Sequence, residues 1–179
     1  MTKRRLTEEQ VATFFVDTTF ETVENGWPEV ADFLNVCSGF EQSPALDPED
    51  YGRFLMIIVS ANIQMITKHF DSGVDRQVIQ RICSKFARAL DIAPETFASK
   101  VKQYRAFMKQ INRPSKNVST AMTRAVFYKY HLNQYQDAYF RDMNTPEPNI
   151  QRDLKQLMEH FLWDWDAFTE SYRVVPTSA

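Results

Sequence analysis

The sequence contains little glycine, little cysteine and few stretches in which apolar and polar residues alternate. Only four glycines occur in 179 residues, and the scarcity of strand-like alternation favours an all-α fold over a sheet-rich one. The two cysteines, Cys37 and Cys83, have neither CxxC nor Cys/His spacing. Free thiols in a reducing compartment are therefore expected, rather than a disulfide or a metal site.

Sequence motifs typical of enzymes are also missing. The chain contains no GxGxxG, GxxxxGKS/T, HExxH or GxSxG motif. None of the histidines, His69, His131 and His160, has an acidic residue three positions before it, so the Glu-x-x-His element of di-iron helical bundles is missing too. His160 and Asp164 lie one helical turn apart, which favours a surface ion pair over two metal ligands or a hydrogen-bonded acid/base pair. We therefore expect no catalytic residues, no bound metal and no cofactor.

No apolar run is long enough to cross a bilayer. The longest, residues 54–66, includes polar residues and is shorter than the roughly 18–20 residues that a spanning helix needs. The first residues, MTKRRLTEEQ, are basic but lack the apolar stretch of a signal peptide, because Glu8, Glu9 and Gln10 follow at once. The sequence therefore predicts a cytoplasmic protein without a membrane span.

Residues 54–66, FLMIIVSANIQMI, instead predict the centre of the fold. Helical spacing places most polar residues of this segment on one narrow line, and apolar side chains cover the rest of the circumference. A helix at about 50–70 that is apolar nearly all round is expected in the middle of a bundle. Asn62 projects away from the polar line. We interpret it as a core amide with hydrogen-bond partners, and contact with a ligand is the alternative.

Helical periodicity extends over most of the chain. Its length and hydrophobic content suit one domain, so we assign residues 1–179 to a single bundle of about six or seven helices, with 1–6 and 174–179 frayed. Apart from the central helix, helices are expected at about 7–24, 28–36, 75–90, 94–111, 119–143 and 149–172. The first begins with the capping-box spacing of Thr7 and Gln10. It is expected to end at Asn25-Gly26.

The net charge of −2 conceals a very uneven distribution of sign. Between Glu8 and Asp50 there are eleven acidic residues and no Lys or Arg, whereas no acidic residue lies between Thr96 and Gln136. The basic residues of that second stretch are Lys100, Lys102, Arg105, Lys109, Arg113, Lys116, Arg124 and Lys129. This asymmetry is the strongest indication of function in the sequence.

Three of these basic residues share one helical face. Lys102, Arg105 and Lys109 recur at steps of three and four residues, and Arg113 and Lys116 follow just beyond the end of the helix. Such a basic face predicts binding of phosphate, nucleic acid or an acidic protein. The alternative is that the face pairs with the protein's own acidic helices or is solvated.

Residues 86–101, FARALDIAPETFASKV, resemble the helix-turn-helix unit of bacterial transcription factors. Ala87 stands where the first helix needs a small residue, and Phe97 and Val101 are inward positions of the second. Asp91 departs from the pattern, since Gly is common at that position of the turn. Two antiparallel core helices joined by a short turn give much the same pattern.

The resemblance implies how the second helix would meet DNA. Ser99, Lys102 and Gln103 would approach base edges or the backbone. Arg105 and Lys109 would hold phosphates.

Aromatic residues are frequent toward the end of the chain. The candidates for lining a small-ligand pocket or a partner groove are Tyr128, Tyr135, Tyr139, Trp163 and Trp165. Core packing is the interpretation that their positions favour, because most of them lie on inward stripes. Trp163 lies off the main stripe, and exposure there would favour self-association into a homo-oligomer.

Together these patterns favour a non-catalytic cytoplasmic binding or adaptor protein whose basic face recognises an acidic protein partner. A DNA-binding regulator that uses residues 86–109 is the first alternative. The second is a ligand-binding or enzymatic bundle with an aromatic pocket. The salt dependence of binding affinity distinguishes these hypotheses, because the affinity for DNA falls steeply as salt rises.

Overall fold

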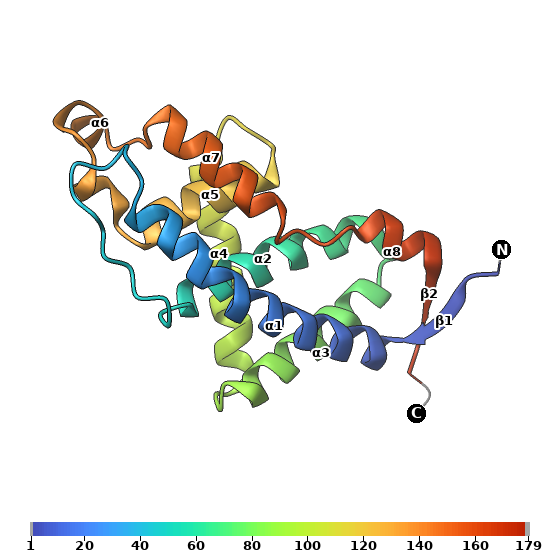
Figure 1. Ribbon diagram of the computed structural model, residues 1–179. Coiled ribbons are helices and arrows are strands. Elements are labelled where there is room, and N and C mark those ends of the chain that lie inside the picture. The colour runs from blue at the N-terminus through green and yellow to red at the C-terminus, as the bar shows by residue number, and fades with distance from the viewer. Residues whose placement is uncertain (1, 178–179) are drawn as a thin grey trace.

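The computed structural model describes residues 2–177 and confirms the all-α class (Figure 1). The protein is 69% helical, and the only sheet among the described residues has two strands. The elements are β1 (Arg4–Thr7), α1 (Glu8–Asn35), α2 (Gly52–His69), α3 (Val74–Ala89), α4 (Pro94–Ile111), α5 (Val118–Lys129), the 3-10 turn η1 (Leu132–Tyr135), α6 (Ala138–Met143), α7 (Pro148–Glu159), α8 (Trp165–Ser171) and β2 (Tyr172–Val175). No described helix combines the length and the apolar character that crossing a membrane requires.

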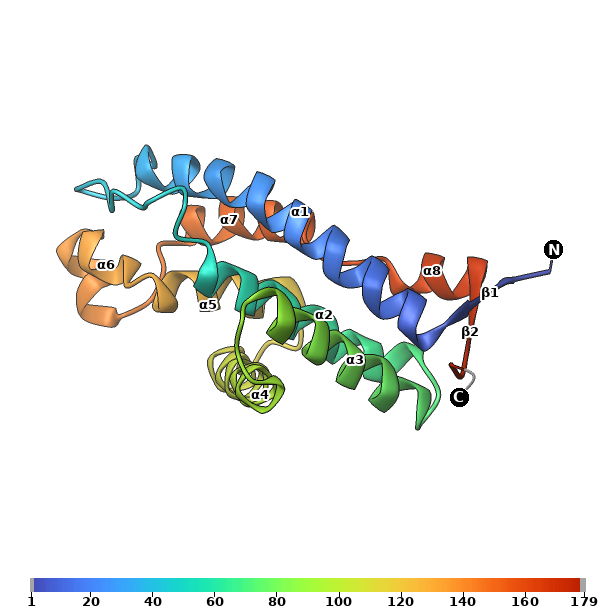
Figure 2. The ribbon, with the colours of Figure 1, turned by 90° about the horizontal axis from the view of Figure 1, so that it is seen from below.

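Helix α2 lies at the centre of the fold, as its apolar sequence predicts. It packs on α1, α3, α4, α5 and α8, and every residue from Phe54 to Ile63 is buried. Figure 2 shows α2 between α1 and α4, so these two helices lie on opposite sides of the central helix. Burial of this apolar surface is the main contribution to the stability of the fold.

The N-terminal segment forms one helix, α1, and the prediction of two helices at 7–24 and 28–36 was wrong. The predicted capping box is present, because Thr7 Oγ1 accepts a hydrogen bond from Gln10 N and Gln10 Oε1 accepts one from Thr7 N. The helix continues through Pro28 because buried residues on both sides of it belong to one stripe. Packing of that stripe outweighs the low helix propensity of Asn25, Gly26 and Pro28.

Gly26 marks a close contact rather than a helix end. A Cβ atom at this position would lie 2.5 Å from Cε1 of Phe161, in the connection between α7 and α8. Glycine therefore lets the Phe161 ring pack directly against the backbone of α1.

The helix predicted over 119–143 is also wrong, because the chain leaves the helical path at Tyr130. The Tyr130 hydroxyl donates to Asp50 O and accepts from Phe54 N, both at 3.0 Å. Its ring stacks on Trp27 with 4.5 Å between centroids. His131 then adopts a left-handed φ of 55° and leads into η1. Contacts between Tyr130 and the start of α2 thus determine where α5 ends.

A second break divides the helix predicted over 149–172 into α7 and α8. The Nδ2 atom of Asn62 donates to Phe161 O and to Ile58 O, and its Oδ1 atom accepts from Trp163 N. This buried amide replaces hydrogen bonds that the chain loses when it leaves the helix. Asn62 is therefore the core amide with partners that the sequence indicates.

The two ends of the chain meet in a parallel sheet. Strand β1 pairs with β2, with Arg4 opposite Tyr172 and Thr7 opposite Val175. The expectation that 1–6 and 174–179 are frayed was wrong for the paired residues, because each strand supplies the backbone partners of the other and Leu6 packs on the core. Residues 1 and 178–179 lie outside the described residues.

Candidate anion-binding groove

A groove of about 660 Å³ lies where α4, the loop after it, the start of α5 and the C-terminal half of α2 meet. Six basic residues line it: Lys68, Lys102, Arg105, Lys109, Arg113 and Lys116. No acidic residue is among the lining residues. We call this site the basic groove. It brings together all five residues that the sequence predicts for the basic face and adds Lys68.

Buried residues of α4 determine which side chains face the groove. Val101 and Met108 are 4% and 1% exposed and hold α4 against the core. Lys102, Arg105 and Lys109 lie beside this buried stripe, on the flank of α4 that lines the groove. Lys102 and Lys109 are exposed and Arg105 is half-buried.

The loop between α4 and α5 is held by hydrogen bonds at both ends. Arg124 Nη1 donates to Ile111 O at 3.0 Å and to Arg113 O at 3.4 Å. Asn117 Oδ1 caps α5 by accepting from Thr120 N at 3.0 Å. These contacts fix the loop that carries Arg113 and the basic residue after it, so the groove is preformed.

The six basic side chains of the groove form no ion pair within the part of the chain that the structure describes. Glu8 and Glu9, at the start of α1, form ion pairs with α3 and not with the groove. Glu9 pairs with Arg81 and Lys85 of α3, which lowers the pKa of Glu9 through the hydrogen bond from Lys85, with burial acting in the opposite direction. Because α1 lies on the opposite side of α2 from α4 (Figure 2), it does not cover the groove.

Two basic residues of the acid-free stretch have structural roles. Arg124 binds backbone carbonyls as described above, and Lys129 Nζ lies 4.7 Å and 4.4 Å from the ring centroids of Tyr104 and Phe107. Such cation–π contacts hold the ammonium group against the protein. No local sequence pattern separates these two cations from those of the groove.

Asn112 lies in the wall of the groove with half of its amide unpaired. The residue is 9% exposed, and its Nδ2 atom donates to Asn117 O at 3.1 Å. Its Oδ1 atom is buried and has no hydrogen-bond partner among the described residues. An unpaired buried acceptor destabilises the protein by about 1–3 kcal/mol. Sequence reasoning missed Asn112, because nothing in the local pattern shows that this amide is buried.

The segment that resembles a helix-turn-helix unit does form two helices joined by a tight turn. Asp91 takes a left-handed φ of 53°, at the position where Gly is common, and the Phe86 and Phe97 rings stack with 5.2 Å between centroids. Ser99 and Gln103 are exposed on α4 but do not line the basic groove.

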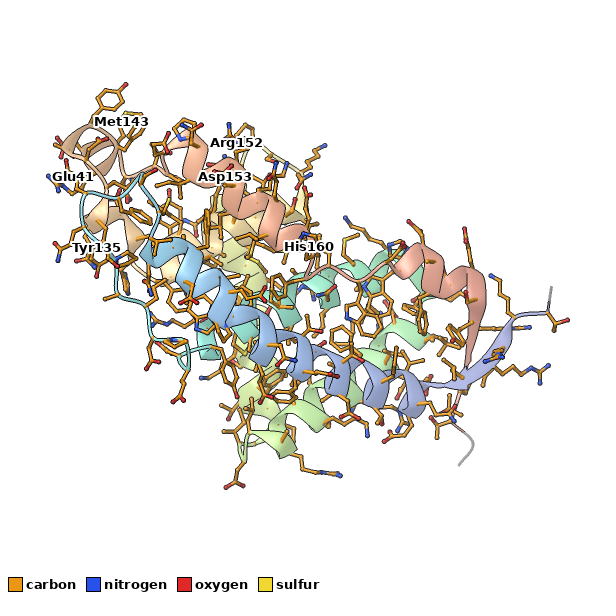
Figure 3. The ribbon with its side chains drawn as sticks, in the orientation of Figure 1. Glu41, Tyr135, Met143, Arg152, Asp153 and His160 are labelled. Carbon is orange, nitrogen blue, oxygen red and sulfur yellow. The ribbon has the colours of Figure 1, made fainter. Side chains whose placement is uncertain are left out.

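The predicted aromatic residues do not form a single pocket. Tyr128 donates its hydroxyl hydrogen to Asn144 O at 2.9 Å. Tyr135 lies at the end of the molecule that carries α6 (Figure 3), and Tyr139 is 68% exposed on that helix. Trp163 and Trp165 stack on each other, with 5.1 Å between centroids, at the junction of α7 and α8. The structure thus separates three of the five residues from the other two.

Trp163 packs against the start of α1. It is half-buried, and its ring lies 5.0 Å from Phe15 and 5.5 Å from Phe14. Phe14 is 57% exposed. The indole therefore closes the edge of the core at this point.

The pair of His160 and Asp164 is separated by the break between α7 and α8. His160 follows the last residue of α7 (Figure 3). Asp164 precedes α8 and accepts a hydrogen bond from Ala167 N at 2.9 Å, which makes it the N-cap of that helix. The predicted ion pair was wrong, because it assumed one continuous helix. Among the described residues, no group of three or more His, Cys, Asp or Glu side chains is placed to hold a metal ion.

Comparisons with protein families, with curated proteins and with solved structures give no match for this chain.

Proposed function

We propose that this protein is a non-catalytic binding or adaptor protein that recognises an acidic partner through the basic groove. The observation that carries the proposal is that six basic side chains line one concave site without an acidic neighbour or an ion-pair partner among the described residues. Positive charges concentrated in this way raise the local potential and attract anions. A cytoplasmic location is part of the same proposal.

The preformed shape of the groove supports the proposal. The loop that carries Arg113 is tied down at both ends, so binding orders few additional residues. A site that is already ordered loses less conformational entropy when a partner binds.

The experiment that tests the proposal measures binding of a fluorescent oligoglutamate peptide by anisotropy at low and moderate salt. The groove variant is Lys102→Glu/Arg105→Glu/Lys109→Glu. The distal variant, Arg4→Glu/Arg5→Glu/Lys100→Glu, has the same net charge and changes exposed residues that do not line the groove. Circular dichroism checks that both variants keep their helices.

We expect salt-sensitive binding that the groove variant loses and the distal variant keeps. Equal loss in both variants would show that net charge alone attracts the peptide. Absence of binding to every anionic probe at low salt would sink the proposal.

A DNA-binding regulator is the second candidate, and the tight turn at Asp91 favours it. The same variants are tested with mixed-sequence duplex DNA. A DNA binder loses affinity steeply with salt, with a logarithmic slope near −0.9 per phosphate contact. Ser99→Ala/Gln103→Ala then weakens DNA binding, because these exposed residues are the ones that would approach base edges, and it leaves peptide binding unchanged.

A further inference from the structure

We infer that the acidic group which the basic groove recognises is a chain of adjacent phosphates, as in a nucleoside triphosphate, rather than a row of carboxylates. This inference rests on the proposed function, since it requires the groove to be an anion-binding site. Three features of the groove carry it: its size, its density of charge and the unpaired amide in its wall.

The size of the groove suits a compact ligand. Its volume of about 660 Å³ falls within the roughly 300–1,000 Å³ of small-ligand sites. A whole protein interface covers about 800 Å² on each side, so the groove accommodates only the anionic group of an acidic partner.

The density of charge favours phosphate over carboxylate. A terminal phosphate carries about −1.5 to −2 charges at neutral pH and each bridging phosphate about −1, so a triphosphate chain places about four negative charges beside the six cations. A peptide would have to place about four carboxylates in the same space, each on its own backbone unit.

The donors of the groove also match phosphate geometry. Arg105 and Arg113 present planar guanidinium groups, which bind phosphate oxygens in pairs. Val118, the first residue of α5, lines the groove as well. The positive end of the α5 dipole therefore adds to the field of the side chains, as at other phosphate sites on helix N-termini.

Asn112 indicates that the ligand carries more than phosphate. Phosphate oxygens only accept hydrogen bonds at neutral pH, whereas the amides of Asn112 and Gln64, which both line the groove, can pair with a donor. The unpaired Oδ1 atom of Asn112 is enclosed by protein atoms, so its side chain must turn toward the groove to bind a ligand. An N–H or O–H group next to the phosphates, as on the base or ribose of a nucleotide, fits this pair of amides.

The test is a competition experiment with the full chain. Adenosine triphosphate and inorganic tripolyphosphate, without magnesium, each compete with the fluorescent oligoglutamate peptide. Direct calorimetric titration covers the case in which the peptide does not bind. We expect both triphosphates to bind at least about tenfold more tightly than the peptide, which corresponds to about 1.4 kcal/mol.

Variants locate the site and distinguish the two sources of phosphate. The groove variant is expected to lose both triphosphates, and the distal variant to keep both. Asn112→Ala is expected to weaken the nucleotide about fivefold or more while leaving tripolyphosphate unchanged, through loss of one hydrogen bond. Equal effects on both ligands would assign the site to free polyphosphate and remove the nucleoside from the inference.

The outcomes separate this inference from the proposed function. Tighter binding of the peptide than of either triphosphate overturns the inference and leaves the proposed function standing. Triphosphate binding that the groove variant retains places the site elsewhere and also overturns the inference. Absence of binding by all three probes overturns both.

Discussion

The Oδ1 atom of Asn62, in the middle of α2, accepts a hydrogen bond of 2.9 Å from the backbone N–H of Trp163. The same side chain donates to Phe161 O at 3.0 Å. One fully buried amide therefore holds the connection between α7 and α8 against the central helix. Residues 62 and 163 are far apart in sequence, so this contact exists only in the folded chain.

Replacement of Asn62 by leucine is expected to destabilise the protein by about 2–4 kcal/mol, because it leaves Phe161 O and Trp163 N without these partners in a buried site. Urea unfolding followed by circular dichroism measures the change in the free energy of unfolding. Thr67→Ala is the control on the same helix, since Thr67 is exposed and its hydroxyl binds only locally. An Asn62→Leu protein as stable as the control would contradict the structural role of the amide.

Gly26→Ala is expected to destabilise the protein by about 1–3 kcal/mol, because the new methyl group meets the Phe161 ring. Helix propensity alone predicts the opposite, a gain of about 1 kcal/mol. Gly52→Ala provides the matched control, since its added Cβ meets nothing within 4 Å beyond its chain neighbours and the backbone of its own helix. Thermal and urea unfolding of the two variants show whether the contact with Phe161 or the gain in helix propensity determines the change in stability. A stabilised Gly26→Ala protein would argue against the close packing of α1 and Phe161.

Sequence patterns predict correctly those features of the fold and the groove that depend only on the spacing of neighbouring residues. The apolar character of 54–66 placed α2 at the centre, and steps of three and four residues placed Lys102, Arg105 and Lys109 on one face. Lys68 was not predicted to belong to the basic face, because it lies at the end of α2, far from α4 in the sequence. Only the packing of α4 on α2 brings it into the groove.

The ends of α5 and α7 could not be predicted from sequence patterns either, because both depend on contacts between residues that are far apart in the chain. The end of α5 depends on bonds from Tyr130 to Asp50 and Phe54, and the end of α7 depends on Asn62. Each of these partners is more than seventy residues away along the chain. Apolar periodicity continues through both breaks, so it predicts one helix where long-range hydrogen bonds make two.

Alkaline pH is expected to destabilise the protein. Burial raises the pKa of the Cys83 thiol to about 11 and also raises the pKa of Tyr130. Below pH 8 these groups are protonated in the folded and unfolded chains alike. As the pH rises past the unfolded pKa of Cys83, near 8.5, only the unfolded chain releases the proton, so the free energy of unfolding falls.

The contribution of Cys83 is measured by comparing the protein with Cys83→Ala. Urea unfolding from pH 7 to pH 10 is expected to show a loss that is smaller by about 1–2 kcal/mol in the variant. The half-exposed Cys37 is expected to react with a thiol reagent at pH 8 in the folded protein, and the buried Cys83 only after unfolding. Parallel pH curves for the two proteins would show that Cys83 does not contribute.

Asp91→Gly is expected to stabilise the protein by about 0.5–1 kcal/mol. The left-handed φ of 53° is strained for aspartate and freely accessible to glycine. Ala89→Gly is the control, because that residue is helical and glycine there is expected to destabilise. The midpoints of urea unfolding give the two changes, and a destabilised Asp91→Gly protein would show that the aspartate side chain contributes more to the turn than its strain costs.

The parallel pairing of β1 with β2 joins the part of the chain that is synthesised first to the part that is synthesised last among the described residues. Strand β1 leaves the ribosome long before its partner and keeps unpaired N–H and C=O groups while the helices assemble. An open strand edge of this kind attracts other extended chains. We therefore expect strand β1 to be the region that depends on chaperones during synthesis, until residues 172–175 emerge and pair with it.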